Sequence, residues 1–108
     1  PDILRGCYTF LSECPPFDKW NLPDASDITF RVIRSASSYG WYEQIGAEHI
    51  IAISSKNVGH TITLVKTMAH ELVHLHQSLR DMPTDHDKAF AGWAEKIAKI
   101  HGFDPNEF

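Results

Sequence analysis

The 108-residue sequence predicts a single α+β domain over residues 1–108. Apolar residues recur every three or four positions near the N-terminus and again from about residue 61 onwards, as in amphipathic helices. Between these regions, three short segments follow the two-residue period of β-strands. With 43% hydrophobic residues, the chain carries enough apolar surface for one core, and no linker or internal repeat divides it.

The first expected element is a helix over residues 2–14, which Pro15 and Pro16 end. Cys7 and Cys14 lie within it, at a spacing that is not that of a zinc knuckle, so we expect reduced thiols. Residues 17–26 hold several turn-forming residues and are expected to form a loop.

Three strands are expected next, over residues 27–34, 40–45 and 48–54. Each has alternating or continuous apolar residues, and Gly46 and Ala47 supply a turn between the last two strands. Because the connections are short, we expect a small three-stranded, mostly antiparallel meander.

The pattern then changes to a helical period from Thr61 or Thr63 to about residue 80, with Pro83 beyond the end. Thr84 or Asp85 can act as the N-cap of a last helix that runs to residue 101. The sequence therefore predicts an N-terminal helix, a small sheet, a long helix and a second C-terminal helix.

The charge of the chain excludes some classes of partner. The formal net charge is -4, so the sequence has no basic excess that would attract nucleic acid or anionic lipid. No apolar run approaches the ~18 residues of a membrane-spanning helix, and no signal pattern opens the sequence. We expect a cytoplasmic protein without membrane association.

The pattern that carries chemistry is His70-Glu71-Leu72-Val73-His74, which has the form His-Glu-x-x-His within an expected helix. At about 100° per residue, His74 returns to within about 40° of His70, so both imidazoles can reach one metal ion. Glu71 lies at the edge of that face, where it can take a proton from a metal-bound water as a general base.

A catalytic zinc site uses a third protein ligand and leaves one position open for water. The downstream candidates are His76, Asp85, His86, Asp87, Glu95 and His101. His86 lies one turn before Phe90 on the inward stripe of the last helix, whereas His76 is turned away from the metal face. We therefore expect His70, His74 and His86 as ligands, with His86 placed at the start of the last helix.

Other residues have two interpretations. His86 could instead pack beneath an aromatic ring at the helix start. Asp85 and Asp87 could orient a ligand imidazole or could be ordinary cap and first-turn acids. Trp41 and Tyr42 could line a substrate groove or belong to the core. The histidines that receive no functional role are His49, His60 and His101.

From about Gly46 to Pro105, the sequence resembles the SprT-like (Spartan-type) metallopeptidase family. The resemblance rests on the strand at 49–53, the His70–His74 motif, the segment Asp85-His86-Asp87-Lys88-Ala89-Phe90, and the stretch from Trp93 to Gly102-Phe103. It implies a zincin-like fold, a Zn²⁺ ion held by three histidines and peptide-bond hydrolysis. Some family members act on proteins bound or cross-linked to DNA, an association that the acidic charge of this chain does not support.

The expected activity is zinc-dependent hydrolysis of a protein or peptide substrate, with Glu71 as the catalytic base. We expect the substrate to lie extended along a free sheet edge, such as the strand at 49–54. Tyr39, Tyr42 and the backbone are open options for stabilising the oxyanion. Two alternatives are a non-catalytic zinc module, which would need a fourth protein ligand, and a metal-dependent hydrolase of a non-peptide substrate.

Overall fold

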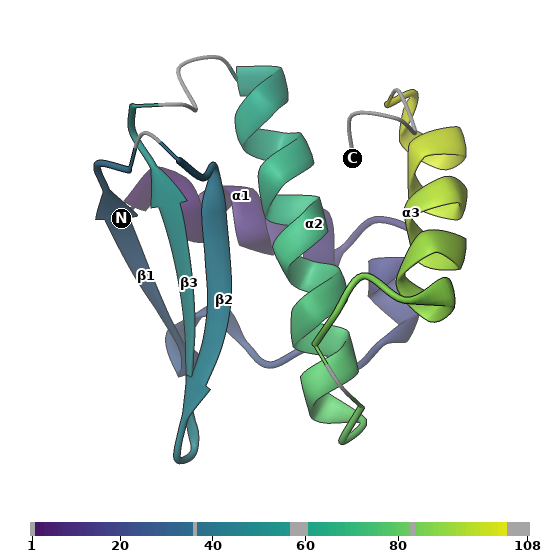
Figure 1. Ribbon diagram of the computed structural model, residues 1–108, viewed down its shortest axis with the longest axis horizontal. Coiled ribbons are helices and arrows are strands. Elements are labelled where there is room, and N and C mark those ends of the chain that lie inside the picture. Colours follow the sequence, from purple (N-terminus) through teal and green to yellow (C-terminus); the bar gives the residue numbers. More distant parts are fainter. Residues whose placement is uncertain (1, 36, 57–60, 83, 104–108) are drawn as a thin grey trace.

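The computed structural model describes residues 2–35, 37–56, 61–82 and 84–103. Its elements are α1 (Asp2–Ser12), the 3-10 helices η1 (Phe17–Lys19) and η2 (Ala25–Asp27), β1 (Ile28–Ile33), β2 (Gly40–Ile45), β3 (Glu48–Ser54), α2 (Thr61–Leu79) and α3 (Lys88–His101). In Figure 1, α2 stands between the sheet and α3, and α1 runs behind α2. This arrangement confirms the coarse α+β prediction.

The sheet is mixed and its strand order is β1-β3-β2, so the expected antiparallel meander is wrong. The central strand β3 pairs with β2 in antiparallel and with β1 in parallel orientation. Residues 50–53 of β3 are apolar without interruption and buried. A strand without a polar face is most stable between two neighbours, which leaves β1 and β2 at the edges.

This strand order shows that the free edge predicted at residues 49–54 is wrong. Because β3 is paired on both sides, it offers no free edge to a peptide. The edge strand next to α2 is β2 (Figure 1).

Two glycines shape the β2–β3 hairpin. Gly46 adopts a φ of +60° in the predicted turn with Ala47. Gly40, at the start of β2, lies so close to β3 that a Cβ atom there would collide with the backbone oxygen of Ala52. Gly40 therefore permits a close approach between the two strands.

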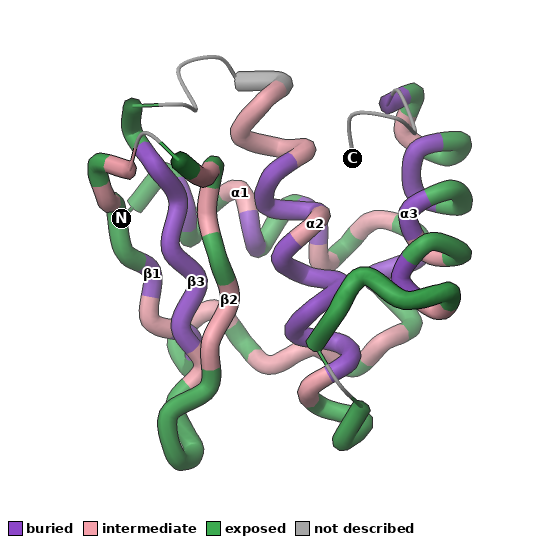
Figure 2. Tube along the Cα trace, in the orientation of Figure 1, coloured by how far each residue is buried: buried purple, intermediate pink, exposed green. Residues whose placement is uncertain are grey.

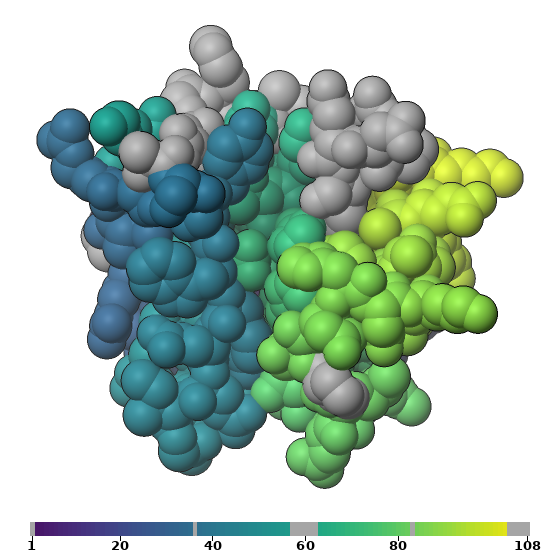
Figure 3. All heavy atoms as spheres, in the orientation of Figure 1, coloured from purple at the N-terminus to yellow at the C-terminus, as the bar shows by residue number. Residues whose placement is uncertain are grey.

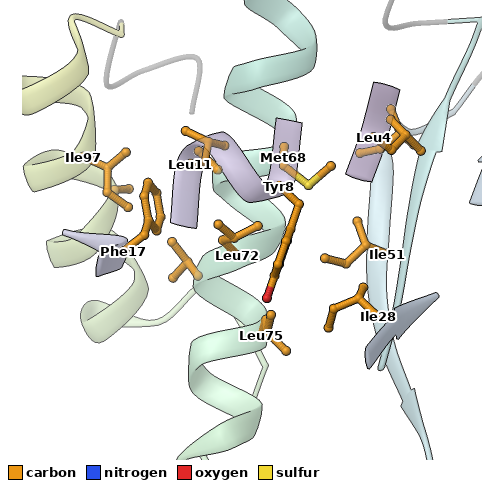
Figure 4. Close-up of a cluster of buried hydrophobic side chains, with 14 of the residues drawn as sticks. Leu4, Tyr8, Leu11, Phe17, Ile28, Ile51, Met68, Leu72, Leu75 and Ile97 are labelled. Atoms are coloured by element: carbon orange, nitrogen blue, oxygen red, sulfur yellow. The ribbon is translucent and has the colours of Figure 1, made fainter. Parts of the chain in front are cut away.

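One core lies between α1, the sheet, α2 and α3 (Figure 4). Helix α1 contributes Leu4, Tyr8 and Leu11, whereas Ile3 and Phe10 of the same predicted apolar pattern are exposed. A helix that lies on a surface buries only one stripe, and here this stripe includes Tyr8, whose hydroxyl donates to the carbonyl of Pro23 at 2.6 Å. The middle of α2 is the most continuously buried helical segment (Figure 2).

The last helix starts later than predicted. Asp87, rather than Thr84 or Asp85, is its N-cap, and the Asp87 side chain accepts a hydrogen bond from the backbone N–H of Phe90 at 3.0 Å. Because α3 begins at Lys88, His86 belongs to the connection before the helix and not to the helix itself.

His60, Pro83, Pro105 and the side chain of Thr61 lie outside the described residues. Within the part of the chain that the structure describes, no helix combines the length and apolar character needed to cross a membrane.

Candidate metal centre

Three imidazoles meet where the connection before α3 passes over α2. His70 and His74 project from successive turns of α2, and His86 approaches them from the connection. The His86 Nε2 atom lies 3.1 Å from Nε2 of His70 and 3.2 Å from Nε2 of His74. Their ligand atoms all lie within 4.8 Å of one another, so the three histidines are close enough to bind one metal ion.

The donor set fits a four-coordinate transition metal. Two nitrogens at about 2.0–2.1 Å from a tetrahedral ion are about 3.3 Å apart, close to the two Nε2 separations of His86. The Nε2 atom of His86 faces the Nε2 atoms of both His70 and His74. A single proton can lie between only two of these nitrogens, whereas one metal ion can accept a lone pair from all three. Imidazole donors suit several divalent metals, so the cluster by itself does not select one.

Gln77 holds His74 in a ligand orientation. Its Oε1 atom lies 2.8 Å from Nδ1 of His74, and its Nε2 donates to the backbone carbonyl of Asp85 at 3.2 Å. The second bond assigns the amide orientation, so Nδ1–H of His74 donates to Oε1 and its Nε2 is left as the ligand atom. Gln77 is only 2% exposed and ties α2 to the segment that carries His86.

The ring of Phe90 packs against all three imidazoles of the cluster. Its ring centroid lies 4.8 Å from that of His70, 4.9 Å from that of His74 and 4.7 Å from that of His86. His86 therefore packs on an aromatic ring, as one interpretation predicted, and it also lies beside the other two histidines, as the ligand interpretation requires.

Glu71 is buried beside the histidines, with 4% of its surface exposed. Burial raises the pKa of its carboxyl to about 8, since desolvation disfavours the charged form. Burial also lowers the pKa of His74, against the opposing effect of its hydrogen bond to Gln77. The lowered pKa favours the neutral imidazole that a metal requires.

A cleft runs between β2 and α2 and passes the histidine cluster. One part, of about 310 Å³, extends from residues 37–40 to Lys66 and Thr67, and the other, of about 180 Å³, is lined by Trp41, Tyr42 and Thr84. Both parts share Gly40, His70 and Glu71. The groove is visible in Figure 3 between the blue surface of β2 and the green segment before α3.

The other candidate ligands have different neighbours. His76 stacks on Trp20 with ring centroids 4.0 Å apart, away from the cluster as expected. His101 contacts the carbonyl of Pro15, and Nδ1 of His49 lies 2.6 Å from the hydroxyl of Tyr42. The side chain of Asp87 caps α3 and does not orient an imidazole. Asp85 contacts the site only through its backbone carbonyl, which accepts a hydrogen bond from Gln77.

The sequence analysis named Tyr39, which lines the larger part of the cleft, but it missed Gln77, Ser37, Ser38 and Thr67. Gln77 stands three residues after His74, the spacing at which helical side chains meet, so this neighbour could have been found from the sequence. Ser37 and Ser38 come from a loop that reaches the cleft only through the fold.

We compared the chain with protein-family models, curated proteins and solved structures, and none of the three comparisons found a match.

Proposed function

We propose that this chain is a zinc-dependent metallopeptidase in which His70, His74 and His86 hold the metal and Glu71 is the general base. One observation carries the proposal: three imidazoles converge in a cleft that the buried carboxyl of Glu71 also lines. The choice of zinc follows the His-Glu-x-x-His pattern and the resemblance to SprT-like peptidases. When bound, zinc supplies Lewis acidity, which activates water and polarises a carbonyl group.

The role of Glu71 in this proposal is to move a proton. Its carboxylate takes the proton of the attacking water and later gives it to the leaving amine. Glu71 lines both parts of the cleft together with His70, so its carboxyl lies within the site where this proton transfer would occur. Gln77 and Phe90 support this chemistry by fixing the imidazoles beside Glu71.

The number of ligands favours a catalytic over a purely structural site. Within residues 2–35, 37–56, 61–82 and 84–103, no fourth His, Cys, Asp or Glu joins the cluster. Structural zinc sites use four protein ligands, whereas catalytic sites use three and leave one position open.

The free edge of β2 supports a peptide as the substrate. The start of this strand borders both parts of the cleft, so an extended peptide that pairs with β2 would lie across the three histidines. This replaces the strand at 49–54, which is central in the sheet.

The test is to measure metal content and peptide cleavage on the same preparations. We expect about one zinc per chain for the unaltered protein and for Glu71→Gln, and less for His86→Ala. Only the unaltered protein should cleave an unfolded protein substrate such as casein. Cleavage by Glu71→Gln at the unaltered rate would contradict the role of Glu71. Stable zinc binding without cleavage of any peptide would favour the non-catalytic module.

A further inference from the structure

The sheet has a second free edge, on the side away from the histidine cluster. In the strand order β1-β3-β2, β1 pairs with β3 on one side, and it is the strand farthest from α2 in Figure 1. The backbone N–H of Ser55, directly after β3, donates to the carbonyl of Ile33 at 2.8 Å, so Ile33 directs its backbone groups toward β3. Because these directions alternate along a strand, the N–H and C=O groups of Phe30 and Val32 point to the free edge. This edge can therefore accept a further strand.

An apolar groove opens beside this edge. Ile28, Phe30 and Val32 lie on the same face of β1, but their exposed fractions are 4%, 5% and 55%. The core thus ends before Val32, and a cavity of about 470 Å³ begins there, within the range of about 300–1,000 Å³ for ligand pockets. The apolar residues along the cavity are Ile3, Leu4, Val32, Ile53 and Leu64. The groove therefore offers an apolar side chain contacts from α1, the sheet and α2.

Three of the four arginines of the chain lie along the same edge, namely Arg5, Arg31 and Arg34. The Arg5 guanidinium lies over the ring of Phe30, 5.7 Å from its centroid, and pairs with Asp2 at 3.4 Å, an exposed pair that contributes little. Among the described residues, no acidic side chain pairs with Arg31 or Arg34. Asp27 precedes β1, at the end of the strand away from the groove. The edge beside the groove is therefore basic, although the net charge of the chain is -4.

We infer that the free edge of β1 binds an extended segment of a partner protein in which apolar and acidic residues alternate. Such a segment would pair with the backbone of Phe30 and Val32 and place its apolar side chains in the groove. Its acidic side chains would then lie on the other face of the sheet, next to Arg31. The inference is independent of the peptidase function, because none of these residues belongs to the histidine cluster or lines the cleft.

The first arm of the test compares three fluorescent peptides. In one peptide Val and Glu alternate, in the second the same residues are grouped in two blocks, and in the third Lys replaces Glu. Each is titrated into Glu71→Gln, so that the proposed peptidase activity does not consume the probe. We expect the alternating acidic peptide to bind about tenfold more tightly than the other two, because only this peptide matches both the groove and the arginines. Equal affinities for the three peptides would overturn the inference.

The second arm places the peptide on one edge of the sheet. Val32→Pro removes an N–H group that points to the free edge and leaves the hydrogen bonds between β1 and β3 in place, so binding should be lost while the fold is kept. The matched control is Gln44→Pro. It removes an outward N–H from the edge of β2, since the N–H of Ser54 donates to the carbonyl of Tyr39 and the directions alternate from there. Loss of binding in Gln44→Pro rather than in Val32→Pro would place the peptide on β2 and contradict the inference.

The third arm uses Arg31→Glu, which changes the charge and leaves the backbone groups of the edge in place. We expect it to weaken binding of the alternating acidic peptide about tenfold and to strengthen binding of the lysine peptide. Lys99→Glu makes the same charge change at an exposed position of α3 and should leave both affinities unchanged. Urea unfolding confirms that each variant is folded. Equal effects of Arg31→Glu and Lys99→Glu would show a general effect of net charge and would also overturn the inference.

Sedimentation of the protein without peptide tests a second copy of this chain as the occupant of the edge. We expect a monomer. A dimer that Val32→Pro abolishes would show that a second copy covers β1, and it would contradict the inference of a partner segment.

Discussion

At the residue scale, Gln77 shows how a neighbouring amide can orient a histidine of the cluster. It accepts a hydrogen bond from His74 and donates one to the carbonyl of Asp85, so one amide positions His74 and the residue next to His86. This partner sets which nitrogen of His74 is available to a metal.

We expect Gln77→Leu to lower zinc affinity by about 10- to 100-fold, because His74 loses its acceptor and the carbonyl of Asp85 loses its donor. Competition with a chromophoric chelator measures the affinity. Gln77→Glu keeps the acceptor and should retain more affinity than the leucine variant. The control is Gln44→Leu, an exposed site where the amide oxygen accepts from Ser78. Equal affinities for Gln77→Leu and Gln44→Leu would show that Gln77 does not support the ligand.

Glu71 links burial to a pH dependence of the metal-free protein. Its pKa is raised from 4.5 to about 8 in the folded state, so between these values the folded chain binds more protons than the unfolded chain. Its contribution to stability is therefore present below about pH 4.5 and is lost as the pH rises toward 8, at up to roughly 1.4 kcal/mol per pH unit.

Urea unfolding of the metal-free protein at several pH values tests this expectation. Glu71→Gln should remove the loss, so the difference in unfolding free energy between the two proteins should grow from pH 5 to pH 8. The comparison isolates Glu71, because the lowered pKa of His74 acts in the opposite sense in both proteins. A difference that does not change with pH would contradict the raised pKa.

At the element scale, the position of β2 depends on Gly40 and the start of α3 depends on Asp87. Gly40 lets β2 lie against β3 at the border of the cleft, and Asp87 fixes where α3 starts. Because Asp87 is the N-cap of α3, His86 is held one residue before this cap and beside the ring of Phe90.

Two glycine substitutions should change stability in opposite directions. Gly40→Ala should destabilise the protein by roughly 1–3 kcal/mol, because the new Cβ meets the backbone oxygen of Ala52. Gly92→Ala should stabilise it by roughly 0.5–1 kcal/mol, because Gly92 is exposed within α3 and nothing lies near its added Cβ. Chemical denaturation measures both. Equal effects of the two substitutions would show that β2 does not need the close approach at Gly40.

At the scale of the whole molecule, the histidine cluster joins α2 to the connection that leads into α3. The helix α2 supplies His70 and His74, whereas His86 comes from the connection to α3, and an ion held by all three would bridge them. A separate contact links α2 to the N-terminal part of the chain: the ring of His76 stacks on that of Trp20.

Zinc should therefore raise the unfolding free energy of the whole chain, by about 2.7 kcal/mol when free zinc is 100 times its Kd. His86→Ala should lose most of this increase, because one ligand is missing. His101→Ala removes a histidine outside the cluster and should keep the increase. Unfolding with and without zinc measures the difference, and an equal increase in both variants would exclude His86 as a ligand.

The sequence by itself determined most of the helices and strands and the three histidines that meet in the cluster. The strand bounds 40–45 and 48–54, the long helix and the cluster of His70, His74 and His86 were all predicted, because periodicity, turn residues and helical spacing act over a few neighbouring positions. Predictions failed where distant segments compete. Only the tertiary structure decided that β3 takes the centre of the sheet, that Asp87 rather than Thr84 or Asp85 caps α3, and that Gln77 reaches Asp85. These outcomes depend on which surfaces are covered and which polar groups find partners once the whole chain has folded, and no local pattern contains that information.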